Sequence, residues 1–317
     1  MVDEEANFFT IFSPHYLERA KRVQEQNLKF VQYTSAEAAA NILRTEEVWL
    51  RNAQCMNDYS EIEHGLDCLI RTFQNEQEGA AFRTLVEEIY PGILAELISL
   101  FDSWVPYFRN GTYIACVSEH PVSEDQYGRL SMWRAYGGDT PVALVLNKEP
   151  FLAETDIFHA YTSPVAYLDT DNFKNHFSAL TGRIDSNREV IMQLGQQKFK
   201  DCLFEVFKNC ILSVKHPGFE EEREWRVVYS PAMRRSDHVK TSMETINGVP
   251  QQVHKIPLKN FPEDGFEGAS ISDFIARIII GPSDQQEVLF STFVSLLQGA
   301  GCADAVNRVH KSGIPLR

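Results

Sequence analysis

The chain has 317 residues, of which 44% are hydrophobic and 23% are charged, and its formal net charge is −14. These proportions exclude a disordered chain, and the charge gives no general attraction to nucleic acid or anionic membranes unless one face is locally basic. No apolar run is long enough to span a membrane, and the acidic N-terminus lacks the features of a secretory signal. We therefore expect a cytoplasmic protein without a membrane partner, with its six cysteines reduced.

The first third of the chain is predicted to be mainly helical. Apolar residues recur at helical spacing from Ser60 to about residue 105, which predicts a helical block over 60–105. Four elements are predicted before it: a helix over 14–26, strands over 30–33 and 48–50, and between these strands a helix that begins at Thr34 or Ser35.

Short strands dominate the second half. A polar loop that ends in residues 130–137 is expected between two strands over 112–117 and 141–146. The later pattern predicts β-structure over 157–168, helix over 171–212, strands over 224–229 and 277–280, a hairpin at Asn247-Gly248, helix over 284–297 and a last strand over 306–310.

This order of elements is typical of an α+β fold, because helices cluster early and in the middle instead of alternating regularly with strands. No repeat, low-complexity tract or linker separates domains. We expect an N-terminal helical segment over 1–28, followed by a single domain over 29–317 with helical insertions.

The familiar motifs of nucleotide-binding loops, serine hydrolases and zinc sites are missing. We therefore predict no metal site. Candidate chemistry is limited to four local groups of residues.

Two of these groups precede predicted helices. Tyr33, Thr34 and Ser35 lie at a strand-to-helix junction, where they either cap the helix or help its free N–H groups to bind an anion. Asn57 and Asp58 lie in a loop before the next helix, where they serve either as turn and cap residues or as polar ligand contacts.

The third group is Ser131, Trp133 and Tyr136. Two aromatic residues three positions apart, ahead of a glycine, form either a stacking wall for a planar ring or part of the core.

The fourth group begins the predicted strand over 224–229. Because side chains alternate along a strand, Glu222, Glu224 and Arg226 are expected on one face and Trp225 on the other. The polar face is either solvated or presents two carboxylates at the mouth of a cleft, one of them held by Arg226. Such a pair can stabilise developing positive charge, as in an oxocarbenium-like transition state.

Taken in order, these groups resemble a bacterial family of unknown function, the family of domains numbered 2971. The residues that carry the resemblance, which covers about 30–317, are Tyr33 and Ser35, Asn57-Asp58 with Glu61, Met132-Trp133 with Tyr136-Gly137, Lys215 to Arg226, and Ile278 to Pro282. This family looks related to the ADP-ribosyltransferase-like fold. The resemblance implies split antiparallel β-sheets with helical insertions, and a cleft between them that binds NAD.

The resemblance also implies roles for individual residues. Glu224 would be the catalytic carboxylate that contacts the ribose, and Glu222 would lie nearer the acceptor. The expected NAD-binding set comprises Tyr33, Thr34, Ser35, Asn57, Asp58, Ser131, Trp133, Tyr136 and Arg226.

The expected function is therefore an NAD-dependent ADP-ribosyltransferase, with NAD as substrate and a nucleic acid or protein as acceptor. Relatives of this fold suggest a bacterial toxin or phage-defence effector, with an antitoxin or regulator as a further partner. Two alternatives stay open. One is a non-catalytic nucleotide-binding or regulatory module of the same fold, and the other is a metal-dependent nuclease that uses Asp58, Glu61, Glu222 and Glu224.

Overall fold

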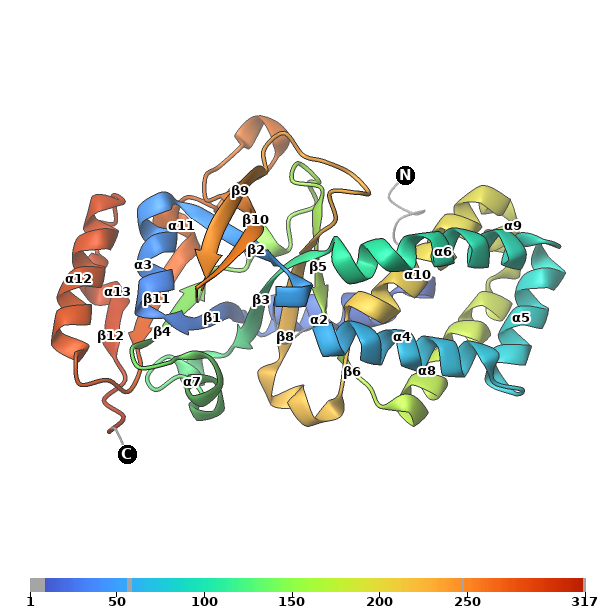
Figure 1. Ribbon diagram of the computed structural model, residues 1–317, viewed down its shortest axis with the longest axis horizontal. Helices are drawn as coiled ribbons and strands as arrows, with labels where there is room; N and C mark the ends of the chain where they lie inside the picture. Colours follow the sequence, from blue (N-terminus) through green and yellow to red (C-terminus); the bar gives the residue numbers. More distant parts are fainter. Residues whose placement is uncertain (1–8, 56–58, 247, 316–317) are drawn as a thin grey trace. The chain divides into compact units, whose positions relative to one another are not determined.

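The computed structural model describes residues 9–55, 59–246 and 248–315 (Figure 1). The chain forms two compact units, each assembled from three segments. The helical unit comprises Met1–Arg19, Asn52–Thr112 and Ser163–Glu221, and the sheet unit comprises Ala20–Arg51, Tyr113–Thr162 and Glu222–Arg317. Helices combined with a large, mostly antiparallel sheet confirm the predicted α+β class.

The helical unit contains the two predicted helical stretches, over 60–105 and 171–212, and both are confirmed. Its long helices are α4 (Tyr59–Gln74), α5 (Glu78–Ile89), α6 (Ile93–Asn110), α8 (Thr170–Ser186) and α10 (Gln196–Leu212), with the shorter α9 (Arg188–Leu194). Strands β6 (Ala166–Tyr167) and β7 (Val214–Lys215) pair in parallel. Within the described ranges, no helix combines the length and the apolar character needed to cross a membrane.

The core of the helical unit forms where α10 packs against α4 and α6. Phenylalanine rings fill this space, and Phe82 and Phe108 are fully buried. Gly65 on α4 lets the two backbones approach closely, because a Cβ at this position would lie 2.4 Å from the carbonyl oxygen of Cys210 on α10. The helical spacing of the apolar residues therefore creates faces that can be buried only against one another.

Ten strands of the described chain form the sheet. They are β1 (Lys29–Ser35), β2 (Glu47–Asn52), β3 (Tyr113–His120), β4 (Pro141–Leu146), β5 (Ala160–Pro164), β8 (Glu224–Tyr229), β9 (Lys240–Ile246), β10 (Val249–Pro257), β11 (Ile275–Ile280) and β12 (Val309–Lys311). The main path runs β12-β11-β4-β1-β3-β2-β10-β9, and β8 joins β3 and β5. Strand β3 thus has three partners, and the sheet branches there.

The position of β4 follows from its composition. All six residues of Pro141–Leu146 are buried, so this apolar strand lies between β1 and β11. Helix α3 (Ala36–Thr45) follows β1 directly and lies beside α12 (Gln286–Gly299), as the blue and red helices of Figure 1 show. The structure also contains the predicted N-terminal helix, as α2 (Pro14–Glu25), and the β9–β10 hairpin, which pairs Ile246 with Val249; Asn247 of its turn lies outside the described residues.

Two local predictions are wrong. The expected loop over 130–137 contains a helix, α7 (Leu130–Tyr136), whose buried Met132 and Trp133 pack on the sheet. The last strand is shorter than predicted, because residues 305–308 form a helical turn. The strand predicted over 224–229 is confirmed with these bounds as β8, and Glu222 ends the 3-10 helix (Pro217–Glu222) before it.

Candidate functional site

Glu224 and Arg226 form a buried ion pair at the start of β8. Glu224 is 4% exposed and Arg226 is 0% exposed, and the Arg226 Nε donates to the Glu224 Oε1 at 2.7 Å. Strand β8 pairs with β3, which sets Glu224 opposite Ser118 and Arg226 opposite Cys116. Hydrogen bonds between ionised groups are roughly twice as strong as neutral ones. The pair therefore fixes the direction of a carboxylate that is buried from solvent.

Glu222 lies two residues earlier and has different partners. Its carboxylate Oε1 accepts a hydrogen bond from the Tyr136 hydroxyl at 2.9 Å, and its main-chain oxygen accepts one from the Arg129 Nη1 at 3.2 Å. The residue between the two acids, Arg223, has a left-handed backbone with φ of 47°. The expected common strand face of Glu222, Glu224 and Arg226 is therefore wrong, because the turn at Arg223 breaks the alternation before Glu224.

The β1–α3 junction has both a capping and a network role. Ser35 is the N-cap of α3, and its side chain accepts a hydrogen bond from the Ala38 amide at 3.2 Å. Thr34 is half-buried in β1, opposite Val142. The hydroxyl of Tyr33 accepts a hydrogen bond from the Arg129 amide at 2.8 Å, and burial raises the pKa of Tyr33 to about 12. Tyr33 is thus a neutral phenol that anchors the chain at Arg129.

Trp133 belongs to the core of the sheet unit. It is 4% exposed, and its ring packs edge-on against Tyr33 with centroids 4.7 Å apart. Its Nε1 donates to the main-chain oxygen of Tyr127 at 2.8 Å. A Cβ on Gly128 or Gly281 would lie within 3 Å of the Trp133 ring. The structure thus encloses the indole, while Tyr136, at the end of the same helix, is exposed. Ser131 is half-buried in the first turn of α7.

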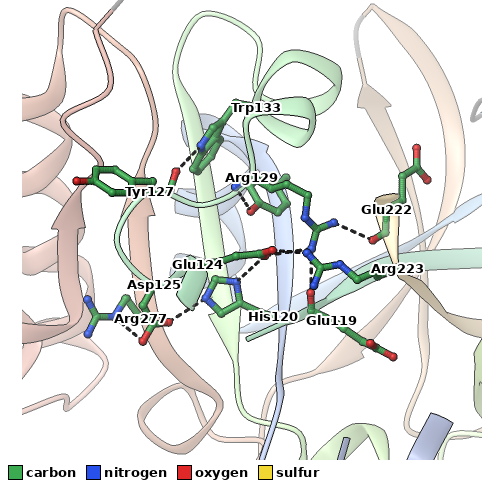
Figure 2. A network of polar contacts seen from close by, with 11 residues as sticks. Glu119, His120, Glu124, Asp125, Tyr127, Arg129, Trp133, Glu222, Arg223 and Arg277 are labelled. Carbon is green, nitrogen blue, oxygen red and sulfur yellow. Dashed lines mark hydrogen bonds and ion pairs between the residues drawn. The ribbon is translucent and has the colours of Figure 1, made fainter. Parts of the chain in front are cut away.

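Arg129 joins these segments, and the sequence alone did not single it out. Its side chain is 7% exposed, and its Nη2 donates to the Glu119 main-chain oxygen at 3.0 Å and to the Glu124 Oε2 at 3.1 Å. The guanidinium of Arg223 binds the other carboxylate oxygen of Glu124. Figure 2 shows the Arg129 side chain extending between Glu124 and the main chain of Glu222.

His120 extends the network on the other side of Glu124. It is 1% exposed, its Nε2 lies 2.9 Å from the Asp125 Oδ1, and its Nδ1 lies 3.9 Å from the Glu124 Oε2. Burial lowers the pKa of His120 from its ordinary value, and the hydrogen bond with Asp125 opposes this shift. The Arg277 Nε lies 4.0 Å from the Asp125 Oδ2 at the edge of the network (Figure 2).

Glu119 completes the buried part. Its Oε1 accepts a hydrogen bond from the Trp225 Nε1 at 3.0 Å, and its Oε2 lies 3.5 Å from the Arg22 Nη2. One signal could have revealed the network. A buried strand ends in Glu119-His120, and Glu124-Asp125 and Arg129 follow within ten residues. Charged residues that gather at a strand end need partners wherever the loop is buried.

The structure therefore connects several predicted site residues. Tyr33, Trp133, Tyr136 and Glu222 are joined directly or through Arg129, whereas Ser35 caps its helix. Asn57 and Asp58 lie outside the described residues. Glu61, from the same motif, binds the Lys215 Nζ at 2.8 Å within the helical unit. Among the residues that the structure describes, no three histidine, cysteine or acidic side chains are grouped so that they could hold a metal ion.

No curated protein and no solved structure matches the chain significantly. A family model does match part of it, over residues 132–227, which include most of α7 and most of β8. The matched segment contains Trp133, Tyr136, Glu222, Glu224 and Arg226. The model is described as "Protein of unknown function (DUF2971)", and the match bears out the predicted resemblance over residues 132–227.

Proposed function

We propose that this protein is an NAD-dependent ADP-ribosyltransferase, with Glu224 as its catalytic carboxylate. The observation that carries the proposal is the buried Glu224–Arg226 pair, which follows two residues after Glu222, an acid that binds the Tyr136 hydroxyl. Tyr33, Trp133 and Tyr136 support the proposal because they are linked to Glu222, directly or through Arg129. The proposal includes a fold of the ADP-ribosyltransferase type, with split sheets. The branching of the sheet at β3 supports this part of the proposal.

The proposed reaction requires charge stabilisation more than acid catalysis. The bond between the ribose C1′ and the nicotinamide nitrogen breaks, and its electron pair neutralises the positive charge of the pyridinium. Positive charge then develops on the ribose, where a carboxylate near the 2′-hydroxyl stabilises it most strongly if water is excluded. The burial of Glu224 meets this requirement, and Arg226 fixes the direction of its carboxylate.

Glu222 suits the second half of the reaction. An acceptor oxygen or nitrogen forms the new bond to C1′ and loses its proton to a base. Glu222 is half-buried and therefore more accessible than Glu224, and the hydroxyl of the exposed Tyr136 orients its carboxylate. We assign the acceptor side of the site to Glu222 and the ribose side to Glu224.

A non-catalytic nucleotide-binding module is the second candidate. It is favoured by the burial of Tyr33, Trp133 and Arg226, because side chains packed in the core stabilise a fold whether or not it performs chemistry. The two candidates differ in one measurable property, which is nicotinamide release.

The test uses the full chain with NAD in the presence of EDTA, and nicotinamide release is measured by chromatography. Glu224→Gln is expected to fold and to lose about 10²–10³-fold in kcat. Glu220→Gln is the matched control, because Glu220 is an exposed acid in the preceding 3-10 helix. NAD labelled in the adenylate phosphate, incubated with cell extract and then digested with protease or nuclease, identifies the acceptor class. NAD binding without nicotinamide release would favour the non-catalytic module, and normal turnover by a folded Glu224→Gln variant would remove Glu224 from its role.

A further inference from the structure

The turn that separates the two acids has an unusual backbone. Arg223 is left-handed, with φ of 47°, although it carries a Cβ. Such a conformation is disfavoured for any residue other than glycine and persists only where the surrounding structure holds it. Residues in strained conformations cluster at functional sites. The contacts that hold this turn are therefore candidates for a role in the proposed site.

Among the contacts of residues 222 and 223 that hold the turn, two lead to Arg129. The Arg223 main-chain oxygen accepts a hydrogen bond from the Glu119 amide at 3.0 Å. The Arg223 guanidinium binds Glu124, whose second oxygen binds Arg129. The Arg129 Nη1 also donates to the main-chain oxygen of Glu222 at 3.2 Å. The buried Arg129 guanidinium thus contacts residue 222 directly and residue 223 through Glu124.

The chemistry of arginine matters here. The two terminal nitrogens of Arg129 donate to acceptors on three segments, namely the end of β3, the following 3-10 helix (Val122–Glu124) and the residue before the turn. A lysine ammonium has the same charge but lacks the planar fork, so it cannot reach these acceptors in the same geometry. The main-chain amide of Arg129 also binds Tyr33, which anchors the arginine to β1.

We propose that Arg129 is a positioning residue that sets the placement of the Glu222 and Glu224 carboxylates relative to each other. It acts through the main chain of Glu222 and through the Glu124–Arg223 pair, and it does not act on the substrate. This inference rests on the proposed function, since it assigns the cost of losing Arg129 to the chemical step. A misplacement of about 1 Å at reacting groups can lower a rate by about 10²-fold.

The test compares Arg129→Lys with Arg308→Lys. Arg308 is a matched control because its guanidinium also binds main-chain oxygens in the sheet unit, those of Ser272 and Ile275 at 2.7 and 2.8 Å. We expect Arg129→Lys to lower kcat for nicotinamide release by about 10–10²-fold and to leave the KM for NAD within about threefold. Arg308→Lys is expected to leave both constants unchanged. If Arg129 had only a structural role, Arg129→Lys would lower the fraction of folded protein, as Arg308→Lys could also do. The kcat of the folded molecules would then stay unchanged.

Hydrogen exchange supplies a readout that does not depend on activity. Loss of the planar Arg129 guanidinium in Arg129→Lys is expected to speed amide exchange in the peptides that contain Glu119 and residues 222–226. Exchange in peptides of the helical unit should not change. Arg223→Gly is a second variant: it adopts the same backbone without strain but loses the guanidinium that binds Glu124. It should fold, with exchange at 222–226 faster than in the wild type and kcat reduced.

The outcomes separate the two proposals. A wild-type protein that releases no nicotinamide refutes the proposed function, and exchange alone then decides whether Arg129 fixes the turn. An active wild type with unchanged exchange at 222–226 in Arg129→Lys overturns the positioning role. An unchanged kcat in a folded Arg129→Lys variant overturns it as well.

Discussion

The buried Glu224–Arg226 pair makes a quantitative prediction about stability. Both side chains are almost completely removed from water, and their hydrogen bond is 2.7 Å long. Removing one partner of such a pair is strongly destabilising, because the other buried charge loses the group that compensates it across this hydrogen bond. We expect Arg226→Met to lower the free energy of unfolding by about 3–5 kcal/mol.

Glu224→Gln is expected to cost less. Glutamine keeps a side-chain oxygen that can accept the Arg226 hydrogen bond, so the change weakens the contact without removing it. The expected loss is about 1–3 kcal/mol. The double variant should be more stable than the sum of the single losses implies, because neither charge then remains buried. We expect a coupling energy of about 2 kcal/mol.

The assay is urea denaturation followed by tryptophan fluorescence and far-UV circular dichroism. Each transition is fitted separately, because two compact units need not unfold together. The pair formed by Arg234 and Asp156, 3.2 Å apart and exposed on both sides, is the control cycle, and no measurable coupling is expected there. Additive losses in the Glu224 and Arg226 variants, within about 0.5 kcal/mol, would refute the reasoning.

Three further predictions follow from the structure. Burial lowers the pKa of His120, so the unfolded chain binds this proton more readily and stability should fall as the pH drops below about 6.5. Between pH 7 and pH 5, His120→Gln should therefore lose less stability than the wild type, and equal losses in the two proteins would contradict this. Burial raises the pKa of Tyr33 to about 12, so its contribution to stability should be complete below pH 10 and lost as the pH rises toward 12. In an ultraviolet titration, the curves of wild type and Tyr33→Phe should therefore differ by one phenol only near pH 12, and a difference that is already complete near pH 10 would exclude this. Gly65→Ala should destabilise the helical unit by about 1–3 kcal/mol, because its Cβ meets the main chain of α10; an unchanged unfolding midpoint relative to the control Gly182→Ala, whose Cβ meets open space, would refute this.

Much of the local structure could be predicted from the sequence. Residues 141–146 form a strand with the predicted bounds, because a short, wholly apolar run can be buried on both faces of a sheet. Ser35 caps a helix as the strand-to-helix pattern indicated, because its side chain needs only the next few residues of the chain. The hairpin that joins Ile246 to Val249 also depends on two turn residues alone.

The candidate site was predicted only in part. Glu222, Glu224 and Arg226 were found as a charged run ahead of a strand, and Tyr33, Trp133 and Tyr136 as polar or aromatic residues near element ends. Their grouping depended on contacts between residues about 100 positions apart, which no local period encodes. Arg129 was missed because its loop has no periodicity and the partners named above come from four other segments.

The sequence by itself determined which segments become helix or strand, since hydrophobic spacing and capping act over a few residues. The tertiary structure decided that residues 130–136 form a helix, that Arg223 turns the chain before β8, and that the sheet branches at β3. Each of these features needs partners distant in sequence. A left-handed arginine or a buried guanidinium is stable only when groups from other segments satisfy its hydrogen bonds and charge.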